Sequence, residues 1–459
     1  MKPNELREKH PYLSYDSYAY HIKNKELWCE FHYTLAPDIH FSPTIRIPLV
    51  EKAPHTQDLD VFVFNLGIME GVNYWKSAVS PQYIIKAGHL TPEQTVWWHT
   101  LIIESLGEFY YTNNIDFRPS DFLTVTSQSD KVIALSESAD YQGNLILSSG
   151  GKDSAVTLEI LKNVQENQAT FTQIINNPER APTDAGNAAG YPHAFKAYKE
   201  IDTTLLQISR QGYLTGHMPF SAMVAFLSLL IAHVFGYKNI IASNEIGANE
   251  GNLPYLDKII NHQYAKSIVF EKMFREYIAT YINKELNYFS ILRPLNELQI
   301  AWLFSQYPRH HLIFRSCNRN LKLDSWCGEC AKCAFIYLVL APFLSQNQLQ
   351  QIFGGDLFQN PAIQQHIRDL VGLGNFKPLE CVGTPAESKI AVFLTLKKFG
   401  KDVLPLPVFL EQLRDNLNLN MDNDTNEIAH ALRQLHKTEH FIPNDYIPLL
   451  IKALQEAHL

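Results

Sequence analysis

The chain contains few charged residues and no surplus of basic ones. Charged side chains make up 19% of its 459 residues, and the formal net charge is −8 at pH 7. Proteins that bind nucleic acid hold the phosphate backbone through a basic surplus. We therefore expect no nucleic-acid partner, and an anionic small-molecule substrate would need a local basic pocket.

The chain also lacks the apolar segment of a signal peptide. Residues 1–17 read MKPNELREKHPYLSYDS, without an apolar core, so we expect a cytoplasmic protein. One stretch without formal charge, residues 219–237, approaches the length of a membrane span. Ser228 and His233 interrupt this stretch, and a short apolar strand follows at 239–243. A helix buried in an α/β domain explains both features, so we expect no membrane association.

Cysteine is scarce, but most of it is concentrated in one place. Four of the six cysteines lie within seventeen residues at the spacing C-x9-C-x2-C-x2-C, namely Cys317, Cys327, Cys330 and Cys333. Thiols stay reduced in the cytoplasm, so this cluster predicts a bound metal and not disulfides. Four thiolates close the tetrahedral shell of a structural zinc ion. An iron–sulfur cluster, or buried cysteines without a metal, would have the same spacing.

The length predicts two or three domains. We expect an α+β accessory domain that contacts the substrate at residues 1–140, a central α/β domain at 141–345, and a mainly helical region at 346–459. In the first region the pattern predicts strands at 28–35, 44–50 and 60–64, and helices at 65–78 and after a capping box at 91–94.

The central region alternates strands with helices. Apolar runs at 145–148, 170–177 and 239–243 predict buried strands, and residues 219–235 predict a helix between the last two. This alternation is typical of a mainly parallel sheet, whose ligands bind at the carboxyl ends of the strands.

The loop after the strand at 145–148 has the composition of a phosphate-binding loop. Residues 149–154 read SGGKDS, and a helix begins within them. The two glycines let backbone N–H groups turn toward an anion, and the helix start adds its positive dipole end. The spacing is not that of the Walker loop, and a solvated glycine turn is the simpler alternative. We expect six residues to bind the phosphates of ATP: Ser149, Gly150, Gly151, Lys152, Asp153 and Ser154.

Within this loop two side chains have further expected roles. Lys152 would offset the charge that develops on the phosphates, and Asp153 would hold Mg²⁺. The loops after the next strands carry Asn176 and, within 243–252, Asn244, both expected at the nucleotide. Glu245 or Glu250 would join Asp153 on Mg²⁺, although a loop that merely carries polar residues would look similar.

The SGGKDS loop resembles the pyrophosphate loop of the N-type ATP pyrophosphatases, which cut ATP between the α- and β-phosphates. Between residues 60 and 390 the chain resembles the bacterial UDP-N-acetylmuramoyl-L-alanyl-L-glutamate epimerases. The stretches that carry this resemblance are 64–76, 97–113, 216–226, 243–252, 261–267, 293–301, 314–318, 326–333 and 380–384. The resemblance implies an α/β fold of the ATP pyrophosphatase (adenine nucleotide alpha hydrolase-like) type.

The resemblance also implies a reaction. The terminal L-glutamate of a UDP-linked muramoyl dipeptide, a peptidoglycan precursor, would be inverted through an acyl adenylate, with release of AMP and diphosphate. We expect His262, Glu245, Glu250 and Cys381 as candidates for proton transfer. Lys266 and Arg315 would supply positive charge to the anionic substrate.

Two other functions remain open at this point. The 7-cyano-7-deazaguanine synthases combine a similar loop with similar cysteine spacing, but they are shorter and have no counterpart of the amino-terminal region. A nucleotide-binding sensor would hold ATP without consuming it. The pairing of Lys152 and Asp153 with nearby carboxylates favours cleavage of ATP over mere retention.

Overall fold

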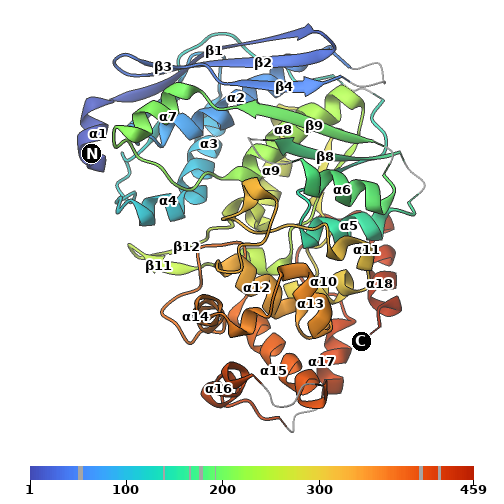
Figure 1. The fold of residues 1–459 in the computed structure, drawn as a ribbon. Coiled ribbons are helices and arrows are strands. Elements are labelled where there is room, and N and C mark those ends of the chain that lie inside the picture. The colour runs from blue at the N-terminus through green and yellow to red at the C-terminus, as the bar shows by residue number, and fades with distance from the viewer. Residues whose placement is uncertain are drawn as a thin grey trace.

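The computed structural model describes residues 1–49, 55–137, 140–164, 167–174, 179–191, 193–402, 407–421 and 425–458. The main sheet has eleven strands. Its labelled strands lie in the upper part of the molecule among several helices, and the lower part is mainly helical (Figure 1). The strand order is β13-β10-β7-β8-β9-β4-β2-β1-β5-β6, with β3 paired to β2. The strands are β1 Tyr12–Lys23, β2 Glu26–Leu35, β3 Ile39–Phe41, β4 Thr44–Pro48, β5 Gln82–Ile85, β6 Thr124–Ser127, β7 Asn144–Leu147, β8 Gln168–Ile174, β9 Ala194–Glu200, β10 Asn239–Ala242 and β13 Asn287–Ser290.

The central part of this sheet is parallel. Strands β13, β10, β7, β8 and β9 pair in parallel, as the alternation of strands and helices predicts. Strand β9 then pairs antiparallel with β4, so a single sheet runs through the two regions expected as separate domains. The division near residue 140 stays a prediction. A small hairpin, β11 Leu253–Tyr255 and β12 Lys258–Ile260, lies apart from the main sheet.

Helices cover the sheet, and they are the regular elements of the described part of the chain beyond residue 331. They are α1 Pro3–Lys9, α2 Leu59–Trp75, α3 Pro92–Ser105, α4 Gly107–Thr112, α5 Lys152–Leu161, α6 Arg180–Ala189, α7 Thr203–Arg210, α8 Phe220–Phe235, α9 Ile268–Tyr281, α10 Glu297–Ser305, α11 Pro308–His311, α12 Ala331–Leu340, α13 Gln346–Phe353, α14 Pro361–Leu370, α15 Pro385–Asp402, α16 Val408–Asn416, α17 Thr425–Leu432 and α18 Ile447–Glu456. The described residues of the carboxyl-terminal region thus contain helices and no strand.

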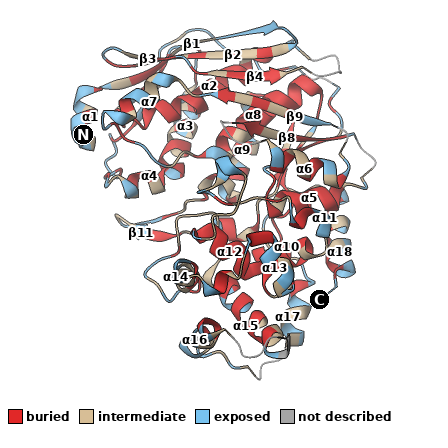
Figure 2. Ribbon diagram, viewed as in Figure 1, coloured by how far each residue is buried: buried red, intermediate tan, exposed pale blue. Residues whose placement is uncertain are grey.

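The expected strand at 60–64 is wrong, because these residues lie inside α2. This helix is buried on nearly every side, as Figure 2 shows, so its apolar residues carry no helical stripe that would separate it from a strand. Its two glycines allow a close approach to the sheet. A Cβ atom on Gly67 would lie 2.1 Å from the hydroxyl of Tyr15, and one on Gly71 would lie 1.9 Å from that of Tyr83.

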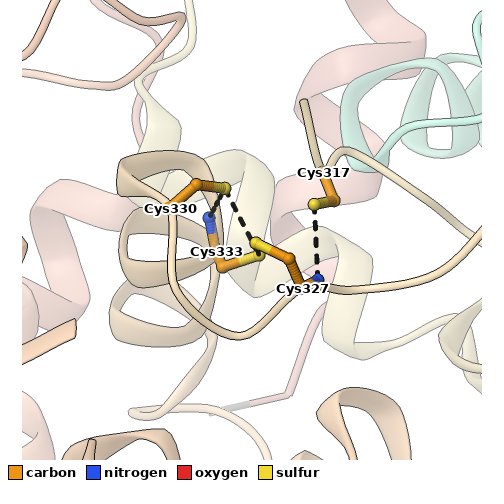
Figure 3. A group of neighbouring side chains, drawn as sticks. All are labelled: Cys317, Cys327, Cys330 and Cys333. Atoms are coloured by element: carbon orange, nitrogen blue, oxygen red, sulfur yellow. Dashed lines mark hydrogen bonds between the residues drawn. The ribbon is translucent and has the colours of Figure 1, made fainter. Parts of the chain in front are cut away.

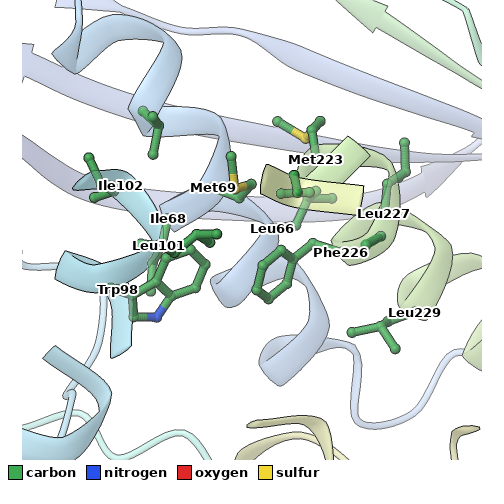
Figure 4. Close-up of a cluster of buried hydrophobic side chains, with 14 of the residues drawn as sticks. Leu66, Ile68, Met69, Trp98, Leu101, Ile102, Met223, Phe226, Leu227 and Leu229 are labelled. Atoms are coloured by element: carbon green, nitrogen blue, oxygen red, sulfur yellow. The ribbon is translucent and has the colours of Figure 1, made fainter. Parts of the chain in front are cut away.

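The uncharged stretch near residue 220 forms α8, which packs in the core beside α2 and α3 (Figure 4). Trp98 of α3 and Phe226 of α8 stack there with ring centroids 4.9 Å apart. The indole N–H of Trp98 donates to the hydroxyl of Tyr277 at 3.0 Å, which ties α9 into the same cluster. No helix among the described residues is long and apolar enough to cross a membrane.

Candidate functional site

The glycine loop joins β7 to α5 and is wedged between two neighbouring segments. Gly150 has a φ of +76°, and a Cβ atom there would lie 2.5 Å from the carbonyl carbon of Ala181 in α6. The backbone N–H of Arg315 donates to the carbonyl of Gly150 at 2.9 Å from the other side. Gly151 adopts an extended conformation, and a Cβ atom on it would lie 3.0 Å from Oγ of Ser316. Gly150 is therefore required by the fold itself.

The start of α5 offers backbone donors to a ligand. Gly151 is the N-cap residue, and no side chain caps this helix. The first N–H groups of an α-helix have no partner within it, and they bind phosphate readily because the dipole adds to their charge. Ser149 is exposed beside these groups, whereas Ser154 is buried with its hydroxyl bonded to the carbonyl of Gly151 at 3.0 Å. The loop fits a phosphate chain.

Lys152 is a fixed cation rather than a mobile one. Its side chain is 1% exposed, its Nζ lies 2.6 Å from Oε2 of Glu297, and it also contacts the carboxylate of Asp153. Burial lowers the pKa of Lys152, but the two carboxylates raise it by more, so the amine stays charged. For Asp153, burial raises the pKa, and Lys152, Lys332 and Lys266 together lower it below the usual value. Both groups therefore stay ionised at the N-terminus of α5.

A group of buried carboxylates lies next to this ion pair. Burial, together with Glu297 and Glu387, raises the pKa of Glu245 to about 8. The backbone N–H of Glu297 donates to Oε1 of Glu387 at 2.7 Å, which fixes the start of α10. Such a concentration of carboxylate oxygen suits a hard divalent cation, and Mg²⁺ binds phosphates through one or two carboxylates. Asp153, Glu297 and Glu245 are the residues that fit this ion.

Two other candidates for the nucleotide have partners within the protein. The side chain of Glu250 is 43% exposed, and its Oε1 lies 3.7 Å from Nζ of Lys377. The amide of Asn244 donates to Oγ of Ser290 at 2.9 Å, so it links two strand ends. Asn176 lies outside the described residues.

A second cluster surrounds Cys381. Nζ of Lys266 donates to Sγ of Cys381 at 3.1 Å, and Nε2 of His262 lies 3.7 Å from the same sulfur. Nδ1 of His262 contacts the carboxylate of Glu108. Nδ1 of His217 lies 3.2 Å from that same Glu108 oxygen. The structure thus joins three of the predicted residues, Cys381, His262 and Lys266, with two that the sequence did not suggest.

The electrostatics of this cluster favour an ionised thiol. Burial raises the pKa of Cys381, but Lys266, His262 and Lys332 lower it well below the usual value. Burial lowers the pKa of His262, but Cys381 and Glu108 bring it up to about 9. His217 goes the other way, because burial and the positive charge of His262 lower its pKa to about 4. These shifts favour a thiolate at Cys381, an imidazolium at His262 and a neutral imidazole at His217.

The four clustered cysteines form the candidate zinc site (Figure 3). Their sulfurs lie within 4.8 Å of one another. Sγ of Cys333 is 3.5 Å from that of Cys330 and 3.7 Å from that of Cys327. Zinc–sulfur bonds of about 2.3 Å place the sulfurs of a tetrahedral site roughly 3.8 Å apart, so the arrangement fits zinc. Backbone N–H groups of Asn320, Cys327, Glu329 and Cys333 point at the sulfurs, as expected for thiolate ligands.

Arg315 lies two residues before Cys317, in the segment that leads into the loop of the four cysteines (residues 317–333). Its guanidinium donates to the carbonyls of Asp324 at 2.8 Å and Phe314 at 2.7 Å. These bonds hold the loop in shape, so the side chain that was expected to bind substrate is used within its own segment.

Comparisons with known proteins bear on the whole chain. Residues 4–291 match the model of the MurL N-terminal domain, and residues 313–440 match that of the MurL C-terminal domain. A protein of Salinispora tropica named UDP-N-acetyl-alpha-D-muramoyl-L-alanyl-L-glutamate epimerase is 30% identical over 87% of this chain and 88% of its own length. A protein of the same name from Micromonospora is 29% identical over 85% of this chain and 88% of its own. The one from Xanthomonas oryzae is 30% identical over 74% and 78%. No solved structure matches the chain.

Proposed function

The chain belongs to the MurL family, and from this membership we propose that it inverts the terminal L-glutamate of UDP-N-acetyl-α-D-muramoyl-L-alanyl-L-glutamate to D-glutamate. The observation that carries this proposal is the match of both MurL domains over most of the chain. An epimerase is an isomerase, here one of peptidoglycan precursor synthesis. The family matches confirm the resemblance to the epimerases that the sequence indicated.

We further propose that ATP activates the glutamate. Removing a proton beside a carboxylate creates a second negative charge on the same group, which a side-chain base achieves poorly. Once the carboxylate is joined to AMP, its carbonyl can accept that charge as an enolate. The glycine loop at the start of α5 supports this step, because it offers backbone donors to a phosphate chain at the carboxyl end of a parallel strand. These features favour the ATP pyrophosphatase type of α/β fold.

In this proposal the charged residues near α5 have separate roles. Asp153, Glu297 and Glu245 would hold Mg²⁺, which would neutralise phosphate charge at this place. Lys152, fixed between Asp153 and Glu297, orients those carboxylates and lowers the electrostatic cost of their proximity. The four cysteines would hold zinc as a structural cross-link, since a closed set of four thiolates leaves no position for water.

The decisive experiment uses the full chain with ATP, Mg²⁺ and the L-alanyl-L-glutamyl precursor in deuterated water. We expect AMP to form and D-glutamate to appear with deuterium at its α-carbon. Formation of AMP without inversion or exchange would leave the adenylation in place and contradict the epimerase assignment. Inversion without nucleotide consumption would contradict the role of ATP. A sensor would do neither.

A further inference from the structure

We propose that Cys381 is the base that removes the α-proton of the activated L-glutamate, and that His262 and Glu108 form a relay that keeps its sulfur available. This inference rests on the proposed function and names the proton-transfer group of that site. In the step, the Cα–H bond breaks and its electron pair moves into the adenylated carboxyl group as an enolate, while the proton joins Sγ. Cα then takes a solvent-derived proton on its opposite face, and the thiol returns its own proton to solvent.

The first support is the chain of contacts behind the sulfur. Nε2 of His262 faces Sγ of Cys381 at 3.7 Å, and Nδ1 of the same ring contacts Glu108. A carboxylate behind an imidazole fixes the ring orientation and stabilises its protonated form, as in the activated nucleophiles of hydrolases. Lys266, at 3.1 Å, adds a second positive group to the sulfur. Cys381 as a whole residue is only half-buried.

The second support is the way in which the backbone of Cys381 is held. Nζ of Lys332 in α12 donates to its carbonyl. The amide of Gln263 donates to the carbonyl of the next residue, Val382, at 3.4 Å. Two residues further on, the backbone N–H of Thr384 donates to Oε2 of Glu387 at 2.6 Å. A segment fixed from three sides positions its sulfur with the precision that proton transfer needs.

The third support is that the two clusters share charged groups. Lys266 and Lys332 interact electrostatically with Asp153 of the glycine loop and also with Cys381. Glu387 contacts both the 384 segment and the start of α10, where Glu297 meets Lys152. The sulfur therefore lies within electrostatic range of the place where the carboxylate would be activated.

The ionisation of the sulfur depends on several charged groups that face it. Lys266, of the short helix η2 Tyr264–Lys266, and Lys332 lower its pKa, and Glu380 lies beside it in its own segment. Glu108 raises the pKa of His262, and Lys76, which directly follows α2, lowers the pKa values of Glu108 and His217. The positive groups in contact with the sulfur outnumber the negative ones, so the thiolate persists at neutral pH.

The neighbouring histidine suggests an alternative that the geometry disfavours. The ligand atoms of Glu108, His217 and His262 lie within 4.8 Å of one another, a spacing that a metal ion could also use. Both ring nitrogens of His262 already face partners, Glu108 on one side and Cys381 on the other. A metal on Nδ1 would separate the ring from the carboxylate that raises its basicity. We therefore assign these residues to a hydrogen-bonded relay.

The first test measures the thiol directly. The full chain is treated with iodoacetamide between pH 5 and 10, and the modification of Cys381 is followed by peptide mass. We expect half-maximal reactivity well below the ordinary thiol pKa of about 8.5, and a shift upward by roughly one pH unit in Glu108→Gln and His262→Asn. Glu104→Gln is the matched control, because Glu104 lies four residues earlier, at the end of α3, and pairs with Lys258 at the surface. An ordinary midpoint, or a midpoint that neither variant moves, would overturn the relay. So would a metal ion that is bound besides zinc and lost in Glu108→Gln.

The second test separates this inference from the proposed function. The assay is run in deuterated water with ATP, Mg²⁺ and the L-alanyl-L-glutamyl precursor. Cys381→Ala should still form AMP, but the rate at which deuterium enters the glutamate α-carbon should fall at least ~100-fold, which is the usual contribution of a general base. Cys381→Ser, which keeps the size of the side chain, should behave alike. Recovery of deuterated L-glutamate would mean that Cys381 acts on the opposite face, and loss of AMP at an unchanged unfolding temperature would place it in adenylation; either would overturn the proposal. If the wild-type protein itself forms no D-glutamate, the proposed function fails, whatever the alkylation profile.

Discussion

Replacing each glycine of the SGGKDS loop by alanine should have a different consequence: a loss of stability at Gly150 and a loss of ATP affinity at Gly151. Gly150 has a φ of +76°, and its added Cβ would lie 2.5 Å and 2.6 Å from backbone atoms of Ala181 and Pro182. The left-handed conformation costs an alanine about 1–2 kcal/mol, and overpacking against a rigid backbone adds about 1–3 kcal/mol. Gly150→Ala should therefore lower the stability by about 2–5 kcal/mol and the unfolding temperature by several degrees.

Gly151→Ala should instead leave the fold intact and weaken the binding of ATP. The φ of −87° and ψ of 176° suit alanine, and the closest atom to its Cβ would be the rotatable Oγ of Ser316 at 3.0 Å. A methyl group that keeps a phosphate from one backbone N–H removes a charged hydrogen bond worth about 1.5–3 kcal/mol, or roughly ten- to a hundredfold in affinity. Gly355→Ala is the control, since its Cβ would meet nothing within 4 Å.

The assay combines calorimetric unfolding with titration of ATP in the presence of Mg²⁺. Gly150→Ala should lose stability, Gly151→Ala should lose affinity, and Gly355→Ala should lose neither. Wild-type affinity in a stable Gly151→Ala protein would refute the backbone phosphate site. Wild-type stability in Gly150→Ala would refute the steric reasoning on the loop.

The other predictions concern the metal, the nucleotide product and pH. Elemental analysis should find about one zinc per chain, lost together with folded structure in Cys330→Ser/Cys333→Ser, because structural zinc contributes roughly 10 kcal/mol or more to folding; iron in its place would contradict this. The nucleotide product should be AMP and not ADP by chromatography, and Lys152→Met should slow its formation at least ~100-fold by releasing the carboxylates that the lysine holds. Burial lowers the pKa of Lys76 to about 8, below its unfolded value, so the native state binds fewer protons between pH 8 and 10.5 and stability should rise with pH across that window. The free energy of unfolding, measured with urea, should rise by up to ~3 kcal/mol across this window, and Lys76→Met should abolish the rise. A rise that persists in the variant would show that another group causes it.

Features of the site that are local in sequence could be predicted, and those that are distant could not. The glycine loop lies between a strand and a helix in direct succession, and the four cysteines lie close together in the chain, so spacing alone indicates what they can bind. Lys152 and Glu297 are 145 positions apart, and His262 and Glu108 are 154 apart. Only the folded sheet and its helices bring such residues together. Glu108 itself looks like one polar residue of an amphipathic helix.

The same limit applies to Arg315, whose binding of substrate stays a prediction. Its charge suits an anionic substrate, but free carbonyls of its own loop lie nearer, and sequence gives no means of weighing them. The error at 60–64 has a different cause, because a helix buried on all sides hides the period that identifies it.

The loop of the four cysteines, residues 317–333, lies between the residues proposed for ATP cleavage and those proposed for proton transfer. On its amino-terminal side the segment at 315–316 bonds to Gly150 and packs against Gly151, so it supports the phosphate loop. On its carboxyl-terminal side Cys330 caps α12, and Lys332 in the first turn of that helix bonds to the carbonyl of Cys381. Loss of the metal should therefore disturb ATP cleavage and proton transfer together, whereas a change at Cys381 alone should affect proton transfer only. This difference in what is lost separates a structural role of zinc from a catalytic one, because a metal that acted on Cα would fail in the same way as Cys381.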